Sequence, residues 1–196
     1  MSCQKRTSTF VTLGASNHCD HERQKNDYYA TDPKAAELLL QAEDLADTIW
    51  ECACGEGHLA KVFESHGKNV IATDLVYRGY GDEEPFDFLK DEPVFFNGDI
   101  VTNPPYRYAL DFVKRAIDIA KNGRKVCMLL KITFLEGQKR KALFLQNPPK
   151  TVHVFSSRLI CAMNGDFDSV SSSPTAYAWF VWEKGYKGDP VIKWIN

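Results

Sequence analysis

The chain has 196 residues, of which 44% are hydrophobic and 26% are charged, so it suits one globular domain with a buried core and is too short for two full domains. Its formal net charge of −2 excludes the basic excess that is typical of a stand-alone nucleic-acid-binding protein. Six cysteines do not make a disulfide scaffold in a chain of this size, and no segment is long and apolar enough to span a membrane. We therefore expect a cytoplasmic protein with reduced thiols.

The first half of the chain predicts an arm followed by a strand–turn–helix–strand unit. Residues 1–26 are polar and lack periodicity, so we interpret them as a flexible arm and residues 27–196 as a single domain. Asp32 and Pro33 are typical of a helix start. The elements expected next are a strand at 48–53, a glycine turn at 55–57, a helix at 58–65 and a strand at 69–73 that Asp74 closes.

The second half predicts a mostly parallel sheet. Only 12 residues separate Asp74 from Asp87 in an irregular stretch, which is close to the minimum for a crossover with its helix, so we expect that helix to be shortened or missing. Further strands are expected at 98–102, 125–134, 152–155 and 176–182, with a helix at 109–120. Strands alternating with helices predict an α/β fold, a Rossmann-like, mostly parallel twisted sheet with helices on both faces.

The glycine turn and Asp74 form a candidate nucleoside site. Glycines where a first strand ends let the backbone turn sharply and approach a ligand closely. An acid at the end of the neighbouring strand, such as Asp74, can accept hydrogen bonds from ribose hydroxyls, although a loop acid that caps the next turn is the structural alternative. The sequence lacks the GxGxxG pattern and the Walker lysine, which disfavours a nicotinamide oxidoreductase and a nucleoside triphosphatase.

The most specific feature is the segment Asn103, Pro104, Pro105 and Tyr106, which follows an expected strand. An exocyclic amino nitrogen is a poor nucleophile because its lone pair is delocalised into the ring, so a catalyst must accept hydrogen bonds from its N–H groups. The Asn103 side-chain oxygen and the Pro104 carbonyl suit that task, and the two prolines stiffen the turn. Tyr106 offers a ring face for a flat substrate. The alternative is a rigid turn with a surface tyrosine.

With these motifs the chain, from Asn26 onward, resembles the DNA N6-adenine methyltransferases, most of all the short versions of phages and prophages. The resemblance implies a class I methyltransferase fold, S-adenosylmethionine as cofactor, and direct methyl transfer to an adenine flipped out of DNA. It makes Asn103, Pro104, Pro105 and Tyr106 catalytic. The cofactor-binding residues that it implies are Tyr29, Thr31 and Pro33 over the amino-acid end, Glu51, Cys54, Gly55 and Gly57 at the methionine side, Asp74 at the ribose, and Asp87 with Phe88 at the adenine.

The expected substrate is less narrowly defined than the expected reaction. No insertion is large enough for a separate target-recognition domain, and only 14 residues follow Trp182, so we expect weak specificity or a partner protein that supplies it. The same motif occurs in enzymes that methylate a glutamine amide of release factors, and related motifs occur in RNA methyltransferases. RNA, a protein glutamine and an inactive cofactor-binding protein are the alternatives.

Four other segments have simpler interpretations. Residues 134–141 are either a phosphate-binding loop or a solvated helix start, and residues 171–174 are either part of a substrate groove or a flexible turn. The adjacent residues 18–21 contain two histidines, a cysteine and an aspartate, but neighbours in sequence rarely converge on one ion, so no metal is expected. The aromatic cluster that we assign to the core comprises Tyr177, Trp179, Phe180 and Trp182.

Overall fold

The structure is a computed structural model that describes residues 30–91, 95–159, 161–162 and 175–196. The expected arm, Tyr29 and the segments 18–21 and 171–174 lie outside these residues. No helix in the described part is long and apolar enough to cross a membrane. In chain order the elements are β1 (Ala30–Thr31), α2 (Lys34–Ala42), β2 (Thr48–Glu51), α3 (Ala60–Ser65), β3 (Asn69–Ala72), β4 (Asp99–Thr102), η2 (Tyr106–Tyr108), α4 (Ala109–Ile119), β5 (Lys125–Lys131), η3 (Ile132–Leu135), α5 (Gln138–Gln146), β6 (Thr151–Phe155), β7 (Cys161–Ala162), β8 (Tyr177–Glu183) and β9 (Val191–Ile195).

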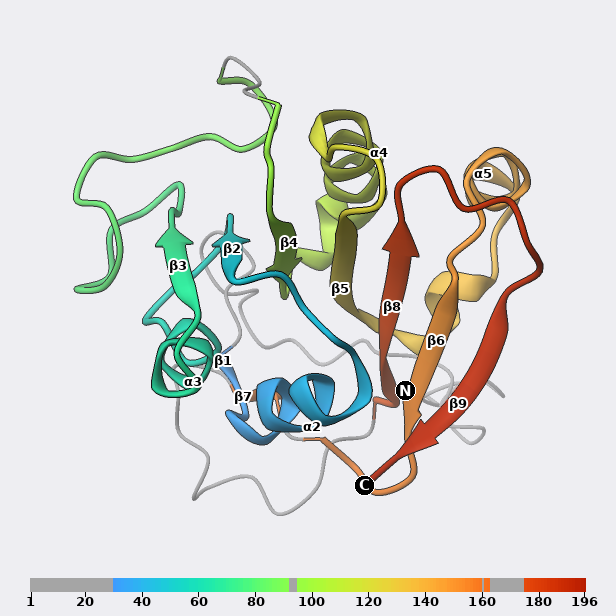
Figure 1. Cartoon of the computed structure of the whole chain (residues 1–196), viewed down its shortest axis with the longest axis horizontal. Helices are drawn as coiled ribbons and strands as arrows, with labels where there is room; N and C mark the ends of the chain where they lie inside the picture. Colours follow the sequence, from blue (N-terminus) through green and yellow to red (C-terminus); the bar gives the residue numbers. More distant parts are fainter. Residues whose placement is uncertain (1–29, 92–94, 160, 163–174) are drawn as a thin grey trace, which may run out of the picture.

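Seven strands form one sheet in the order β3-β2-β4-β5-β8-β6-β9, with β3 at one end and β9 at the other (Figure 1). Neighbouring strands are parallel except that β8 runs antiparallel to both β5 and β6. The expected mostly parallel α/β sheet is therefore confirmed. Because β2, β3 and β4 are parallel, their carboxyl ends meet at one edge, which we call the carboxyl edge. The glycine turn, Asp74 and Asn103 all follow strands at this edge.

Helices cover both faces of the sheet, as the alternation of buried side chains shows. On β5, Val126, Met128 and Leu130 pack in a core cluster with α4, whereas Cys127 and Leu129 pack in a second cluster with α2 and α3. Successive strand residues point to opposite faces, so a strand that is apolar throughout must be covered twice. The expected aromatic core residues are all buried, namely Tyr177, Trp179, Phe180 and Trp182.

The connection between β3 and β4 contains no helix in residues 73–91 or 95–98, which confirms the expected loss of a crossover helix. Hydrogen bonds hold this connection beside the carboxyl edge instead. The Phe86 N–H donates to the Asp74 carbonyl (2.9 Å). Farther along, the Phe88 ring packs edge-on against Trp50, with ring centroids 5.4 Å apart. In the described parts of this connection, the chain therefore returns to the sheet without a helix of its own.

Some expected boundaries were wrong. β5 ends at Lys131 rather than at Phe134, because its partner β8 begins at Tyr177, directly opposite Lys131. The chain then forms the short 3-10 helix η3, and α5 starts at Gln138, so the basic segment 134–141 contains a helix start. Strand β9 was not expected. Four of its five residues are exposed, so no alternation of buried and exposed positions marks it as a strand.

At the opposite edge of the sheet, Glu43 links α2 to β5 and β6. Its carboxylate accepts a hydrogen bond from Lys125 Nζ (2.9 Å) and lies 2.8 Å from His153 Nε2. The Glu43 side chain is only 11% exposed. Burial raises the pKa of Glu43, but the hydrogen bonds from His153 and Lys125 lower it to about 2. This cluster stabilises the packing of α2 on the sheet.

Candidate active site

The turn after β2 has a backbone that favours glycine. Gly55 and Gly57 have φ angles of 57° and 77°, in the left-handed region that side chains with a Cβ rarely adopt. The Gly57 N–H donates to the Cys54 carbonyl (2.8 Å), and the Cys54 N–H donates to Thr73 beside it (3.0 Å). A Cβ on Gly57 would lie 2.3 Å from the Tyr80 ring. The turn is thus tight, tied to β3, and closely packed by the loop that follows β3.

Cys54 itself is a packing residue of this turn. Its side chain is 5% exposed, and its thiol lies 3.8 Å from the Tyr80 carbonyl. Burial raises the pKa of Cys54 to about 12, with a smaller contribution from the nearby acids. The nucleophilic thiolate is therefore scarce at neutral pH.

Asp74 lies directly against the glycine turn. Its Oδ2 atom accepts the Gly55 N–H (2.9 Å), and its Oδ1 atom accepts the Val76 N–H (2.9 Å) and a hydrogen from Arg78 Nη1 (2.9 Å). The structure thus joins the two expected parts of the nucleoside site through one hydrogen bond. A carboxylate has about four acceptor positions, and these contacts use most of them.

Glu51, the last residue of β2, is a buried carboxyl group with one unsatisfied oxygen. It is 2% exposed and accepts a hydrogen bond from the backbone of Ala60 at the start of α3. Its Oε2 atom has no hydrogen-bond partner among the described residues. Burial raises the pKa of Glu51 well above its usual value. Buried acceptors of this kind are rare in native proteins and often indicate a functional site.

Asn103 meets the N-terminal motif across the sheet edge. Its Nδ2 atom donates to Thr31 Oγ1 (2.8 Å), so residues 72 positions apart in sequence are in contact. Thr31 belongs to β1, which pairs with β7, and it is 4% exposed. Pro104 is buried beside Asn103, whereas Pro33 is exposed at the start of α2. The structure therefore brings Thr31 to the expected catalytic segment and leaves Pro33 at the surface.

Tyr106 lies between aromatic and cationic neighbours. Pro105 precedes the short helix η2, in which Tyr106 is the first residue. The Tyr106 ring is 5.8 Å from the Tyr177 ring, with an angle of 31° between their planes. Lys131 Nζ lies 4.9 Å from the Tyr106 ring centroid. The ends of three adjacent strands, β4, β5 and β8, thus contribute to one cluster at the carboxyl edge.

Asp87 and Phe88 differ in their environment. The Asp87 carboxylate accepts hydrogen bonds from Lys90 Nζ (2.7 Å) and from the Leu89 N–H (3.1 Å), and the hydrogen bond from Lys90 lowers its pKa. Asp87 directly follows Phe86, whose N–H is hydrogen-bonded to the Asp74 carbonyl. It therefore lies near the ribose side of the candidate site. Phe88 is 2% exposed and packs in the core, so its ring points away from solvent.

Three residues of the carboxyl edge were not predicted from the sequence. Arg78 pairs with Asp74, Lys131 lies over Tyr106, and Leu75 is 53% exposed directly after Asp74. None belongs to a motif. The available signals were weak, namely a charge at the end of a buried strand for Lys131 and an apolar residue following a strand-end acid for Leu75.

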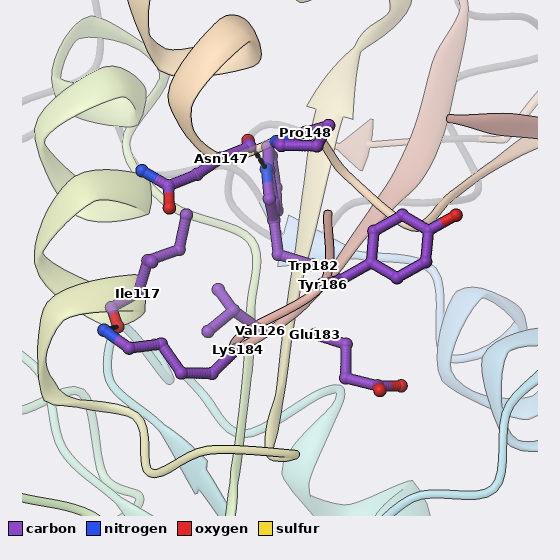
Figure 2. A pocket seen from close by; sticks show the side chains of 9 residues that line it. Ile117, Val126, Asn147, Pro148, Trp182, Glu183, Lys184 and Tyr186 are labelled. Atoms are coloured by element: carbon purple, nitrogen blue, oxygen red, sulfur yellow. Dashed lines mark hydrogen bonds between the residues drawn. The ribbon is translucent and has the colours of Figure 1, made fainter. Parts of the chain in front are cut away.

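A pocket elsewhere on the molecule is separate from these residues. Figure 2 shows that its lining comes from α4, the start of β5, the end of β8 and two loop segments, residues 147–148 and 184–186. Trp182 Nε1 donates to the Asn147 carbonyl (3.0 Å), and Lys184 Nζ donates to the Ile117 carbonyl (2.5 Å). Because β8 is antiparallel to β5, the pocket lies at the edge opposite Asn103. It is therefore no part of the candidate active site.

Comparisons with known proteins identify the fold. No protein-family model matches the sequence, and no curated protein matches it. A presumed RNA methyltransferase from Pyrococcus horikoshii has a TM-score of 0.60 at 13% identity, over 89% of this chain and 95% of that one. The modification subunit of a presumed type I restriction enzyme from Vibrio vulnificus has a TM-score of 0.57 at 13% identity, over 83% of this chain but 45% of the subunit.

A third solved structure carries the cofactor in its name. It is a presumed class I S-adenosylmethionine-dependent methyltransferase from Listeria monocytogenes, with a TM-score of 0.52 at 11% identity, over 94% of this chain and 69% of that one. Identities this low establish the fold alone. Together with the strand order, they show that this chain has the Rossmann-like fold of class I S-adenosylmethionine-dependent methyltransferases.

Proposed function

We propose that this protein transfers a methyl group from S-adenosylmethionine to the exocyclic N6 nitrogen of adenine in DNA. The observation that carries the proposal is the contact between Asn103 and Thr31. Because the Asn103 amide nitrogen donates to a buried hydroxyl (2.8 Å), the orientation of the amide is fixed and its oxygen is directed away from Thr31. An acceptor held in this way, followed by the Pro104 carbonyl, is suited to bind an amino group.

The charges at the carboxyl edge fit the cofactor. The unsatisfied Glu51 Oε2 atom is an acceptor for the ammonium of the methionine end. Asp74 accepts the Gly55 N–H (2.9 Å), and its remaining acceptor capacity would serve the ribose hydroxyls. The exposed side chain of Leu75 offers an apolar surface to the adenine ring next to it. Each end of the cofactor therefore meets a residue whose chemistry complements it.

The protein residues act by orienting the substrate and by accepting hydrogen bonds. When bound, S-adenosylmethionine would supply an electrophilic methyl carbon: the carbon–sulfur bond breaks as a carbon–nitrogen bond forms, S-adenosylhomocysteine leaves, and the proton lost by the nitrogen passes to solvent. The Asn103 oxygen and the Pro104 carbonyl accept the N–H hydrogens, which turns nitrogen density toward that carbon. Holding both reactants in line supplies much of the rate. Flipping the base costs a few kcal/mol, and stacking on Tyr106 returns about 1–3 kcal/mol.

The names of the structural neighbours bear on the substrate. The similarity to a modification subunit of a restriction enzyme supports DNA, and its description as a subunit supports a partner protein that contributes specificity. The similarity to a presumed RNA methyltransferase makes RNA the second candidate. A protein glutamine amide has similar nitrogen chemistry and is the third acceptor to test.

The test is methyl transfer to separate acceptors. The wild type, Asn103→Ala and a control, Asn122→Ala, are incubated with radiolabelled S-adenosylmethionine and pools of DNA, RNA or protein. Asn122 is exposed at the opposite edge, so its variant reports on nonspecific damage. We expect label in DNA from the wild type and the control, none from Asn103→Ala, and equal binding of S-adenosylhomocysteine by all three. Label in RNA or protein alone refutes the DNA substrate. A wild type inactive on every pool indicates a cofactor-binding protein instead.

A further inference from the structure

Lys131 is a partly buried cation at the carboxyl edge that has no anionic neighbour among the residues that the structure describes. It is the last residue of β5, and its ammonium lies 4.9 Å from the centroid of the Tyr106 ring. Among the described residues, no carboxylate is within salt-bridge distance of Lys131 Nζ. A cation–π contact of this kind contributes about 0.5–2 kcal/mol, but it does not neutralise the charge.

Three other partly buried lysines have carboxylate partners, and a fourth, Lys184, donates to the Ile117 carbonyl (2.5 Å). Lys68 lies 3.8 Å from Asp47, Lys125 lies 2.9 Å from Glu43, and Lys150 lies 2.6 Å from Glu183, each measured from Nζ to the nearest carboxylate oxygen. These pairs are what is expected when a long cationic side chain leaves water, because partial burial weakens its hydration. Lys131 lacks such a partner among the described residues, and it lies at the edge of the sheet where the substrate is expected.

From this contrast we infer that Lys131 contacts a phosphate of the nucleic-acid strand that carries the target base. The inference rests on the proposed function, because the base is expected to stack on Tyr106, next to the ammonium. A flipped nucleotide carries its own phosphates into the site, and the Lys131 ammonium lies 4.9 Å from the centroid of the stacking ring. Neither a glutamine side chain nor the cofactor brings a phosphate to this position.

The surroundings of Lys131 suit a polyanion. Arg107 is exposed in η2, which follows β4. Lys139 and Lys141 are exposed in the first turn of α5, which follows β5 through η3. These segments continue from the ends of the neighbouring strands β4 and β5, so they belong to the same edge of the sheet as Lys131. Binding of a phosphate backbone by several cations weakens as salt rises, because each phosphate contact releases bound counterions.

The experiment compares Lys131→Gln with Lys131→Arg and with a matched control, Lys121→Gln. Lys121 is an exposed lysine beyond the end of α4, at the edge opposite Asn103. Binding of a fluorescently labelled DNA duplex containing adenine is measured by anisotropy, with S-adenosylhomocysteine present, between 50 and 200 mM NaCl. Calorimetry with S-adenosylhomocysteine alone, and thermal unfolding, report on the cofactor site and the fold.

We expect Lys131→Gln to bind DNA about tenfold more weakly, as for the loss of one charged hydrogen bond. The slope of log K against log salt should become shallower by about 1. KM for DNA should rise more than kcat falls, while cofactor affinity and melting temperature stay unchanged. Lys131→Arg and Lys121→Gln should keep the wild-type slope.

An unchanged slope for Lys131→Gln overturns the inference. So does a loss of cofactor affinity or thermal stability without a change in slope, because that result assigns Lys131 only to supporting the Tyr106 ring. These outcomes are distinct from failure of the proposed function. If the wild type methylates DNA and Lys131→Gln behaves like it, this inference alone is wrong, whereas a wild type with no activity on nucleic acid refutes the proposed function as well.

Discussion

Replacing Glu51 with Gln tests the candidate cofactor site and the electrostatics of the fold together. In the folded protein without cofactor, burial raises the pKa of Glu51 well above its usual value. Ionisation is therefore harder in the folded state than in the unfolded state, so this group reduces the free energy of unfolding as pH rises above the unfolded pKa. Glutamine cannot ionise. The stability of Glu51→Gln relative to wild type should increase between pH 5 and pH 8, by at most about 1.4 kcal/mol per pH unit.

The size of the expected gain in stability follows from the single Oε2 atom of Glu51 that has no hydrogen-bond partner among the described residues. A buried polar group without a partner costs about 1–3 kcal/mol, and each kcal/mol shifts the melting temperature of a chain of this size by about 2–4 °C. Cofactor binding should change in the opposite direction. In the proposed complex, the Oε2 atom accepts a hydrogen bond from the ammonium of the cofactor, whereas the glutamine amide can place N–H hydrogens there. Loss of a charged hydrogen bond worth about 1.5–3 kcal/mol weakens cofactor binding roughly 10- to 150-fold.

Thermal unfolding at pH 5 and pH 8, and calorimetry with S-adenosylhomocysteine at pH 8, measure both effects. The control is Glu56→Gln, in the same turn but with its side chain 44% exposed, for which neither quantity should move. If Glu51→Gln binds S-adenosylhomocysteine as tightly as wild type, the Oε2 atom does not contact the ammonium. If its relative stability falls as pH rises, the raised pKa is wrong.

Three further changes test other parts of the account. Arg78→Gln removes the hydrogen bond from Arg78 Nη1 to Asp74 Oδ1 (2.9 Å) and so frees an acceptor position for the ribose. Calorimetry should therefore show cofactor binding that is a few-fold tighter, by roughly 1 kcal/mol. Weaker binding would mean that Arg78 positions the Asp74 carboxylate instead. Thr31→Val removes the hydroxyl that accepts the hydrogen bond from the Asn103 amide. Steady-state kinetics should then show kcat reduced roughly five- to tenfold, equivalent to about 1 kcal/mol, while cofactor affinity stays within about twofold of wild type. An unchanged kcat would contradict the role of this contact. Burial raises the pKa of Glu43, but its histidine and lysine partners lower it from 4.5 to about 2, so Glu43→Gln should lose up to about 3 kcal/mol at pH 7. Because a lowered pKa stabilises the fold only above the unfolded value, urea unfolding should show that this deficit disappears as pH falls from 4.5 toward 2, and a deficit independent of pH would refute the assignment.

The parts of the fold that the sequence predicted are those in which local chemistry and topology agree. Gly55, Gly57 and Asp74 mark the ends of strands, and a parallel sheet places such ends at one edge. The short interval between Asp74 and Asp87 predicted that the crossover helix is absent, as it is from residues 73–91 and 95–98, because chain length limits what a connection can contain. β5 is buried on both faces, with alternate side chains in the two core clusters, and this explains why a continuous apolar run predicted a central strand.

The remaining features depend on partners that are distant in sequence. The end of β5 at Lys131 is set by the start of β8, 46 positions later, and nothing near Lys131 encodes it. The exposed strand β9 is held by its ladder to β6 rather than by an apolar face of its own. Likewise, the contact of Arg78 with Asp74 depends on the path of an irregular loop. Sequence patterns indicate which chemistry is available, whereas neighbouring strands and loops decide which groups meet.

The most direct test of the account is to express the wild type and Asn103→Ala in a host that lacks adenine methylation, and to analyse digested host DNA by nucleoside mass spectrometry. We expect N6-methyladenine in DNA from cells with the wild type and none above background with Asn103→Ala, at equal levels of folded protein. DNA from the wild-type cells without N6-methyladenine, or equal amounts from both, would contradict the central claim that the Asn103 amide directs methyl transfer to adenine in DNA.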